Sequence, residues 1–194
     1  MPDRQGRADT TTAGLIVHGI GAAVGGDTAA ARCDLQAVQR KPESERRYYA
    51  VETSLLEAWM QARAERWEEV IRLLEPSTTR GQQPTLSGRL PIRWLVAEAY
   101  EHMGRLDAAA AAYESVLLPT GFSVRWTGPG FCMRGIFYPF AQQRLVLIDA
   151  RLGRIEAARR HWKLLQQTLT APDPELRPMI DAARQALARA EAQA

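Results

Sequence analysis

Two segments of the chain are near-copies of each other, and this internal repeat constrains the fold more than any other feature. Residues 104–109 read Gly-Arg-Leu-Asp-Ala-Ala, and residues 153–158 read Gly-Arg-Ile-Glu-Ala-Ala. The pattern recurs at residues 26–31 and, in a weaker form, at residues 65–70. We call the first residue of each copy its anchor: Gly26, Glu65, Gly104 and Gly153. Four related copies predict four supersecondary units of one kind.

Each anchor is expected to form a tight turn between two helices. Glycine adopts the left-handed backbone conformation that ends a helix at no steric cost, whereas Glu65 has to adopt it without that freedom. Small or short side chains lie seven residues before the anchors (Gly19, Ala58, Ala97, Val146) and five after them (Ala31, Val70, Ala109, Ala158). A large residue follows nine positions after each anchor (Leu35, Leu74, Tyr113, Trp162). Small residues at both places allow paired helices to approach closely, and the large residue fills space against the next unit.

This pattern resembles the tetratricopeptide repeat family. The third unit matches best, with Ala97, Tyr100, Gly104, Ala109 and Tyr113 at motif positions. The resemblance implies an all-α fold, a right-handed α-solenoid of about four helix-turn-helix pairs with a C-terminal capping helix. The spacings of 39, 39 and 49 residues exceed the family's usual 34, and Gln61 and Asp149 stand where the third unit has Tyr100.

The predicted organisation follows from these anchors and from the turn signals between them. A disordered tail is expected at residues 1–12, a repeat domain at 13–170, a loop at 76–90 and a capping helix at 173–194. The four units are expected at about 13–40, 45–75, 91–118 and 136–169. Their helices are expected at 13–24 and 27–39, 45–64 and 66–75, 91–103 and 105–117, and 136–152 and 154–169.

The family resemblance places a binding surface on the first helix of each pair. In the third unit, Trp94, Glu98 and His102 form one stripe at helical spacing. Trp59 and Arg63 form a similar stripe in the second unit, and Arg151 lies at the equivalent place in the fourth. Aromatic anchors beside cationic donors suit an acidic or C-terminal peptide. The alternative is that both tryptophans are packing residues and the charges form a solvated face.

A second candidate site is the aromatic-rich insertion at residues 119–140. It contains all four phenylalanines, together with Trp126 and Tyr138. Long loops between repeats are often functional, so the insertion could close over a small apolar molecule in a cavity lined by Phe131, Phe137 and Tyr138. Alternatively, these aromatic side chains fill the wider gap left by the 49-residue spacing.

Composition restricts the remaining function classes. With 46% hydrophobic and 24% charged residues, the chain falls in the range of folded globular proteins. Its net charge of +3 is spread along the sequence, so no nucleic-acid partner is expected. No run approaches the ~20 apolar residues of a membrane span. No catalytic constellation, cofactor motif or metal-ligand spacing stands out, and the two cysteines lack partners at a CxxC spacing. The sequence therefore predicts a cytoplasmic, non-enzymatic scaffold for a protein or peptide partner, of the kind found in bacterial signalling or regulatory systems.

Overall fold

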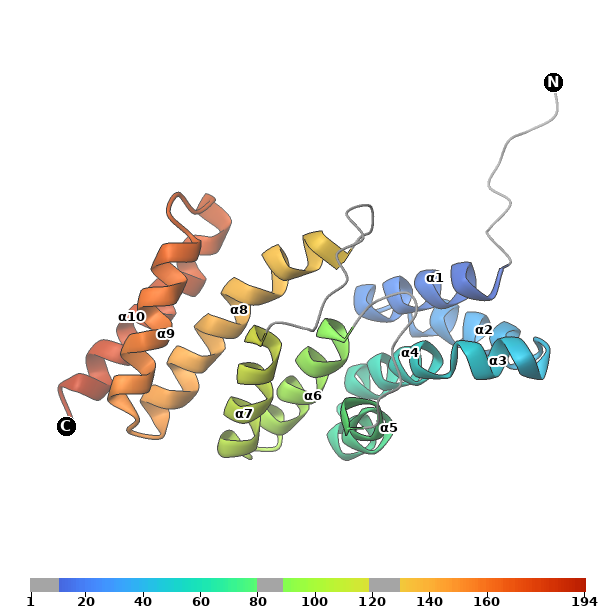
Figure 1. The fold of residues 1–194 in the computed structure, drawn as a ribbon, viewed down its shortest axis with the longest axis horizontal. Coiled ribbons are helices and arrows are strands. Elements are labelled where there is room, and N and C mark those ends of the chain that lie inside the picture. Colours follow the sequence, from blue (N-terminus) through green and yellow to red (C-terminus); the bar gives the residue numbers. More distant parts are fainter. Residues whose placement is uncertain (1–10, 80–88, 119–129) are drawn as a thin grey trace, which may run out of the picture. The chain divides into compact units, whose positions relative to one another are not determined.

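The protein is all-helical throughout the part of the chain that the structure describes, residues 11–79, 89–118 and 130–194 of a computed structural model. The all-α prediction is confirmed for these residues, which form ten α-helices and one short 3₁₀ turn (Figure 1). They divide into two compact units, residues 1–95 and 96–194, with the division inside helix α6 (Leu90–His102).

The first unit contains five helices before α6: α1 (Thr12–Gly25), α2 (Thr28–Gln39), α3 (Glu43–Tyr48), α4 (Ala50–Arg63) and α5 (Trp67–Thr79). Thr11 and Asp27 begin α1 and α2 by accepting hydrogen bonds from backbone N–H groups in the first turn, at 3.0 and 2.9 Å. Helix α1 packs against both α2 and α4, and α4 packs against α5. Ala23, Ala31 and Leu56 form a buried cluster where α1, α2 and α4 meet.

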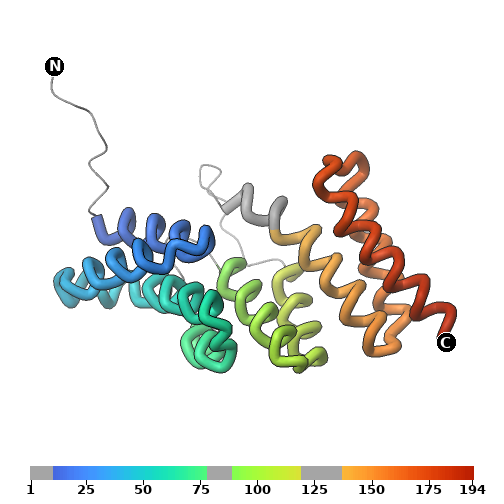
Figure 2. The backbone as a smooth tube through the Cα atoms, turned by 180° about the vertical axis from the view of Figure 1, so that it is seen from behind, coloured from blue at the N-terminus to red at the C-terminus, as the bar shows by residue number. Residues whose placement is uncertain are grey.

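The second unit contains the end of α6, then α7 (Leu106–Leu117), α8 (Gly130–Arg151), α9 (Ile155–Thr168), a 3₁₀ turn η1 (Pro174–Leu176) and α10 (Arg177–Glu191). Helix α8 packs against α7 on one side and α9 on another, and α10 packs against both α8 and α9 (Figure 2). Val146, Ala158, Leu165, Ala183 and Leu187 form the shared core of these last helices.

All four anchors adopt the left-handed conformation predicted for them. Their φ angles are 91° at Gly26, 56° at Glu65, 71° at Gly104 and 70° at Gly153. In each turn the anchor N–H donates to the carbonyl three residues before it, and the next N–H donates to the carbonyl four residues before the anchor, at 2.8–3.2 Å. These two bonds define the Schellman motif, so one turn geometry recurs four times.

The small residues predicted to permit close helix packing are all buried. Ala31, Ala58, Ala97, Ala109 and Ala158 have no exposed surface, and Val70, Val146 and Gly19 are also buried. Gly19 shows how close the approach is, because a Cβ atom there would lie 2.9 Å from Leu56 Cδ2 and 3.2 Å from Asp34 Cβ. Both distances are shorter than a normal van der Waals contact.

Two predicted boundaries in the first unit are wrong. The single helix expected at 45–64 is two helices, because Tyr49 (φ −102°, ψ 22°) leaves the helical conformation between α3 and α4. The loop expected at 76–90 is helical at its start, since α5 continues to Thr79 with Pro76 inside it. Proline removes one helix hydrogen bond but keeps a φ angle that a helix tolerates. Residues 80–88 lie outside the described residues.

The predicted tail, insertion and capping helix also need correction. Thr11 caps α1 and Thr12 is its buried first residue, so only residues 1–10 of the expected tail lie outside the described part. Helix α8 begins at Gly130 and runs through Pro139, so residues 130–140 of the expected insertion are helical, and 119–129 are not described. The region 173–194, expected to form a capping helix, contains the turn η1 followed by helix α10, and its role as a cap stays a prediction.

Candidate functional site

The residues predicted to bind a partner occupy both units. Trp59, Arg63 and Trp94 lie in the first unit, on α4 and α6. Glu98, His102 and Arg151 lie in the second, on α6 and α8. Their gathering on one shared face stays a prediction.

The first helices of all four pairs repeat the same pattern of exposure. Six residues before the anchor the side chain is half-buried in every pair (Ile20, Trp59, Glu98, Leu147). Two residues before the anchor it is exposed in every pair (Val24, Arg63, His102, Arg151). The stripe predicted from spacing therefore has a half-buried base and an exposed end in each pair, and the exposed end carries a cationic or titratable side chain in three of the four.

Trp59 also contributes to packing. Its ring lies against the cluster of Ala23, Ala31 and Leu56. Arg63 lies one helical turn after Trp59. Its side chain extends toward the turn between α1 and α2, because a Cβ atom built on Gly26 would lie 2.9 Å from Arg63 Nη2. The packing role that the sequence allowed for the tryptophans thus applies at least in part to Trp59, while Arg63 stays exposed.

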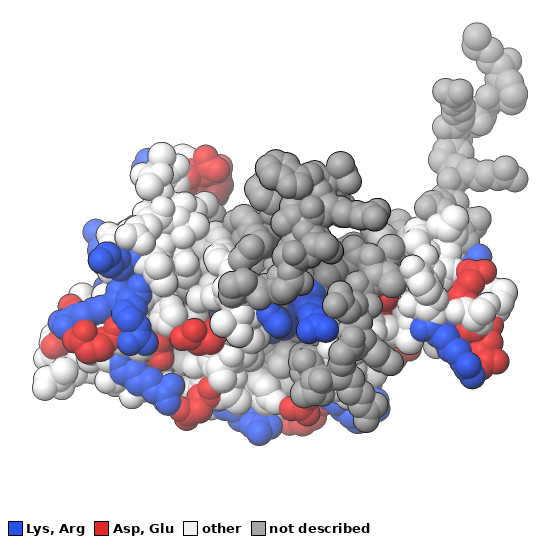
Figure 3. Space-filling model, viewed as in Figure 1, with Lys and Arg blue, Asp and Glu red and all other residues white. Residues whose placement is uncertain are grey.

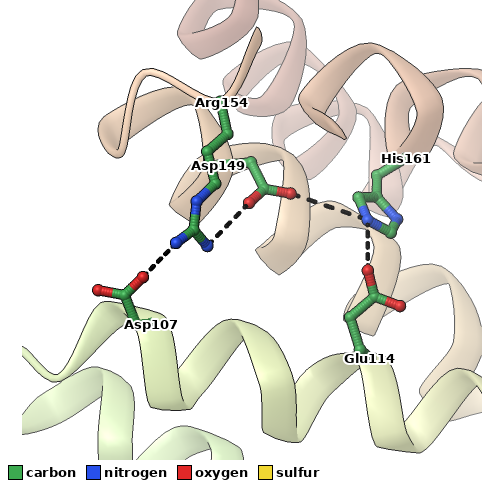
Figure 4. A network of polar contacts seen from close by, with 5 residues as sticks. All are labelled: Asp107, Glu114, Asp149, Arg154 and His161. Carbon is green, nitrogen blue, oxygen red and sulfur yellow. Dashed lines mark hydrogen bonds and ion pairs between the residues drawn. The ribbon is translucent and has the colours of Figure 1, made fainter. Parts of the chain in front are cut away.

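A polar network that the sequence did not predict as a site links α7, α8 and α9 in the second unit (Figure 4). Its centre is Asp149, whose side chain is 5% exposed. Asp149 stands at the repeat position that Tyr100 occupies in the third pair. There Arg105, the residue after the anchor, lies over the Tyr100 ring at 5.0 Å. In the fourth pair the equivalent Arg154 faces the carboxylate instead, with Nη1 3.9 Å from Asp149 Oδ1. An ion pair replaces a cation–π contact at the same place in the repeat.

The network continues from α8 and α9 to α7 through two further contacts. Arg154 also donates a hydrogen bond to Asp107 in the first turn of α7. His161, buried on α9, has its Nε2 3.1 Å from Glu114 Oε1 and 3.7 Å from Asp149 Oδ2. Its Nδ1 is buried and has no hydrogen-bond partner. The imidazole of His161 thus faces a carboxylate on α7 and a carboxylate on α8 through the same nitrogen.

Burial dominates the electrostatics of Asp149. Loss of hydration raises the pKa of this carboxyl, and His161 and Arg154 oppose that rise by favouring the charged form. A cavity of about 320 Å³ lies beside it, lined by Asp107, Ala110, Ala111, Glu114, Leu145, Asp149, Arg154, Ala157 and Arg160. Three acidic and two basic side chains thus line this cavity together with three alanines.

A smaller polar cluster ties α6 to α7 and α8. The buried Tyr113 hydroxyl donates to Glu101 Oε2 at 2.9 Å, and Arg144 Nη1 lies 3.5 Å from Glu101 Oε1. Burial and the neighbouring Glu101 and Glu98 raise the pKa of Tyr113 well above its ordinary range. Tyr113 is consequently a neutral hydrogen-bond donor in the core, at the position where the sequence predicted a large packing residue.

The aromatic side chains of the expected insertion give partial information on its role. The Tyr138 hydroxyl donates to the Leu117 carbonyl, which ties α8 to the end of α7. Phe137 is half-buried and Phe140 is exposed. Phe122 and Trp126 lie outside the described residues. Tyr138 fits the packing alternative, and a ligand-enclosing role stays a prediction.

One signal in the sequence could have located the network. Asp149 occupies a position that is aromatic in the best-matching pair, and a carboxylate at a buried repeat position requires cationic neighbours. The contact between Glu114 and His161, by contrast, gave no signal in the sequence. The two residues are 47 positions apart and meet only through helix packing.

The surface of the described residues mixes both signs of charge, and these residues offer neither a metal-binding cluster nor a helix that could span a membrane. On the face drawn in Figure 3, the described basic and acidic residues lie interspersed within each unit. No group of three or more His, Cys, Asp or Glu side chains in the described ranges has the geometry to hold a metal ion. None of the helices described is long and apolar enough to cross a membrane.

Comparison with known proteins adds no assignment. No family model matches the chain, and neither the curated proteins nor the solved structures searched contain a significant match.

Proposed function

We propose that the chain is a tetratricopeptide-like scaffold, a right-handed α-solenoid of four helix pairs that binds a protein or peptide on the first helices of its pairs. The observation that carries the proposal is the fourfold recurrence of one unit. Each pair has the same left-handed Schellman turn, the same buried small residues and the same exposure pattern along its first helix. Such units each leave a first-helix face that neighbouring units extend into one binding surface.

The chemistry of that surface favours an acidic partner. Arg63, His102 and Arg151 are exposed at equivalent places, where their cationic forms can donate to carboxylates, and the half-buried residues one turn earlier provide contact area. The alternative explanation is that cations near helix C-termini only complement the helix dipole. The proposal requires more than this, namely that their charge determines affinity for a ligand. On this view the protein is a cytoplasmic bacterial scaffold without catalytic activity.

Charge reversal separates these two explanations. Peptides selected from a random library on the wild-type protein provide a ligand, and their affinity is then measured by fluorescence anisotropy. Arg63→Glu and Arg151→Glu should each weaken binding at least tenfold, about 1.4 kcal/mol, and the effect should shrink at high salt. Matched controls are Arg32→Glu and Arg189→Glu, which change the same charge at exposed positions on α2 and α10.

Stability has to be measured beside affinity. Charge reversal at exposed positions leaves the core intact, whereas Trp59→Ala removes a ring from the Ala23, Ala31 and Leu56 cluster and should lower the melting temperature as well. Selected peptides that bind both Arg63→Glu and Arg151→Glu with wild-type affinity would refute the proposed surface. An equal loss of peptide affinity in the two control variants would mean that the net charge of the protein alone explains the effect.

A further inference from the structure

Asp149 is a buried carboxylate that receives no hydrogen bond from the described residues. Its two neighbours in the network, Arg154 Nη1 at 3.9 Å and His161 Nε2 at 3.7 Å, are both beyond hydrogen-bond distance. Buried carboxylates normally accept hydrogen bonds, because losing hydration without replacement is costly. The side chain also lines the cavity of about 320 Å³ between α7, α8 and α9. An acceptor that lacks donors therefore faces a space large enough for a small group.

The lining of this cavity sets the charge and shape of what it can take. Asp107, Glu114 and Asp149 contribute three carboxylates, whereas Arg154 and Arg160 contribute two guanidinium groups. With Asp149 ionised, these five charged side chains carry one excess negative charge. The remaining lining residues, three alanines and a leucine, offer an apolar surface for a methylene chain.

We propose that this cavity binds an organic cation carried on an alkyl stem, a lysine ammonium or arginine guanidinium of a partner or a free amine of the same chemistry. The cation donates N–H groups to Asp149 and Glu114, and its stem lies on Ala110, Ala111 and Ala157. One positive charge neutralises the lining, whereas an anion would double its excess charge. The site is separate from the proposed first-helix surface, since none of the residues two or six positions before the anchors lines it.

The electrostatic state of Asp149 is consistent with such a site. Burial raises the pKa of the carboxyl, which means that the ionised form lacks adequate stabilisation from its present neighbours. A bound cation supplies that stabilisation, and binding should be tighter for the ionised than for the protonated carboxyl.

The proposal is tested with n-butylammonium and n-butylguanidinium, with n-butanol and butyrate as matched neutral and anionic probes. Each is titrated into ¹⁵N-labelled protein at pH 7.5 in low-salt phosphate buffer, and amide shifts are followed by NMR. Both cations should produce saturable shifts around residues 107–114, 149 and 157–161, and neither butanol nor butyrate should do so. Asp149→Asn, which keeps the shape and removes the charge, should weaken cation binding at least tenfold. Ala111→Leu, an exposed residue whose enlargement fills the cavity, should weaken it similarly.

The control is Glu156→Gln on α9, an exposed acid outside the cavity that pairs with Arg159. It should leave cation affinity unchanged. Equal affinity in wild type and Asp149→Asn, equal loss in Glu156→Gln, or shifts spread over the whole surface would each overturn the proposal, as would the absence of saturable binding. Capped tripeptides with a central lysine or arginine distinguish the sources: binding like the butyl probes supports a partner's side chain, and exclusion of the peptides supports a free amine.

Discussion

Adding one methyl group should stabilise the protein at Gly21 but not at Gly19, although both glycines lie in helix α1. At Gly19 a new Cβ would lie 2.9 Å from Leu56 Cδ2 and 3.2 Å from Asp34 Cβ. Leu56 is fully buried and cannot swing away freely, and the Asp34 Cβ moves only with the backbone of α2. At Gly21 no atom lies within 4 Å of the added methyl group.

The magnitudes follow from two opposing terms. Replacing a glycine inside a helix with alanine stabilises the helix by about 1 kcal/mol, and this gain applies to both positions. Overpacking at Gly19 costs about 1–3 kcal/mol, because α2 or Leu56 has to move. Gly21→Ala should therefore raise the free energy of unfolding by about 1 kcal/mol. Gly19→Ala should change it by between zero and about −2 kcal/mol.

Urea denaturation followed by circular dichroism measures both variants against wild type. The difference between the two variants, about 1–3 kcal/mol, isolates the packing term, since helix propensity cancels. If Gly19→Ala were stabilised as much as Gly21→Ala, α1 and α2 would not approach each other as closely as the repeat requires, and the packing argument for the small residues would fail.

Three further predictions address the turns, the small residues and the network. Glu65→Gly should raise the melting temperature, because it removes about 1 kcal/mol of left-handed backbone strain, whereas Glu68→Gly inside α5 should lower it. Ala109→Leu and Ala158→Leu should each lower the unfolding free energy by about 1–3 kcal/mol, and unchanged melting in both would mean that the helices do not meet there. Burial raises the folded-state pKa of Asp149, so its contribution to stability is full below the unfolded value of about 4 and is lost as pH rises through the folded-state pKa. Relative to Asp149→Asn, the wild type should therefore lose stability from about pH 4 upward, and a pH-independent difference in urea midpoints would contradict this assignment.

The turns and the close-packed positions could be predicted from sequence because each depends on local rules. A glycine after an apolar helical stretch predicts a left-handed helix end, and small residues at fixed distances from it predict close packing. Glu65 shows the strength of the repeat signal. A weaker copy of the motif placed an anchor there, and the residue adopts a positive φ despite its side chain.

Helix ends and the polar network could not be predicted in the same way. Pro76 indicated a loop, but α5 continues through it, because one proline removes a single hydrogen bond without preventing helical φ angles. The break at Tyr49 has no glycine or proline to mark it. The network depends on residues from three helices, and the 47 residues between Glu114 and His161 hide their contact from any local pattern.

The most direct test of the proposed scaffold is to map a bound peptide on the protein by NMR. A peptide selected on the wild-type protein is titrated into ¹⁵N-labelled chain, and side-chain and amide shifts are assigned. We predict that the largest changes recur two and six residues before successive anchors, including Arg63, His102 and Arg151, with the 39- and 49-residue spacings of the repeat. Changes confined to the exposed faces of α2, α7 and α9, with the first helices unaffected, would contradict it.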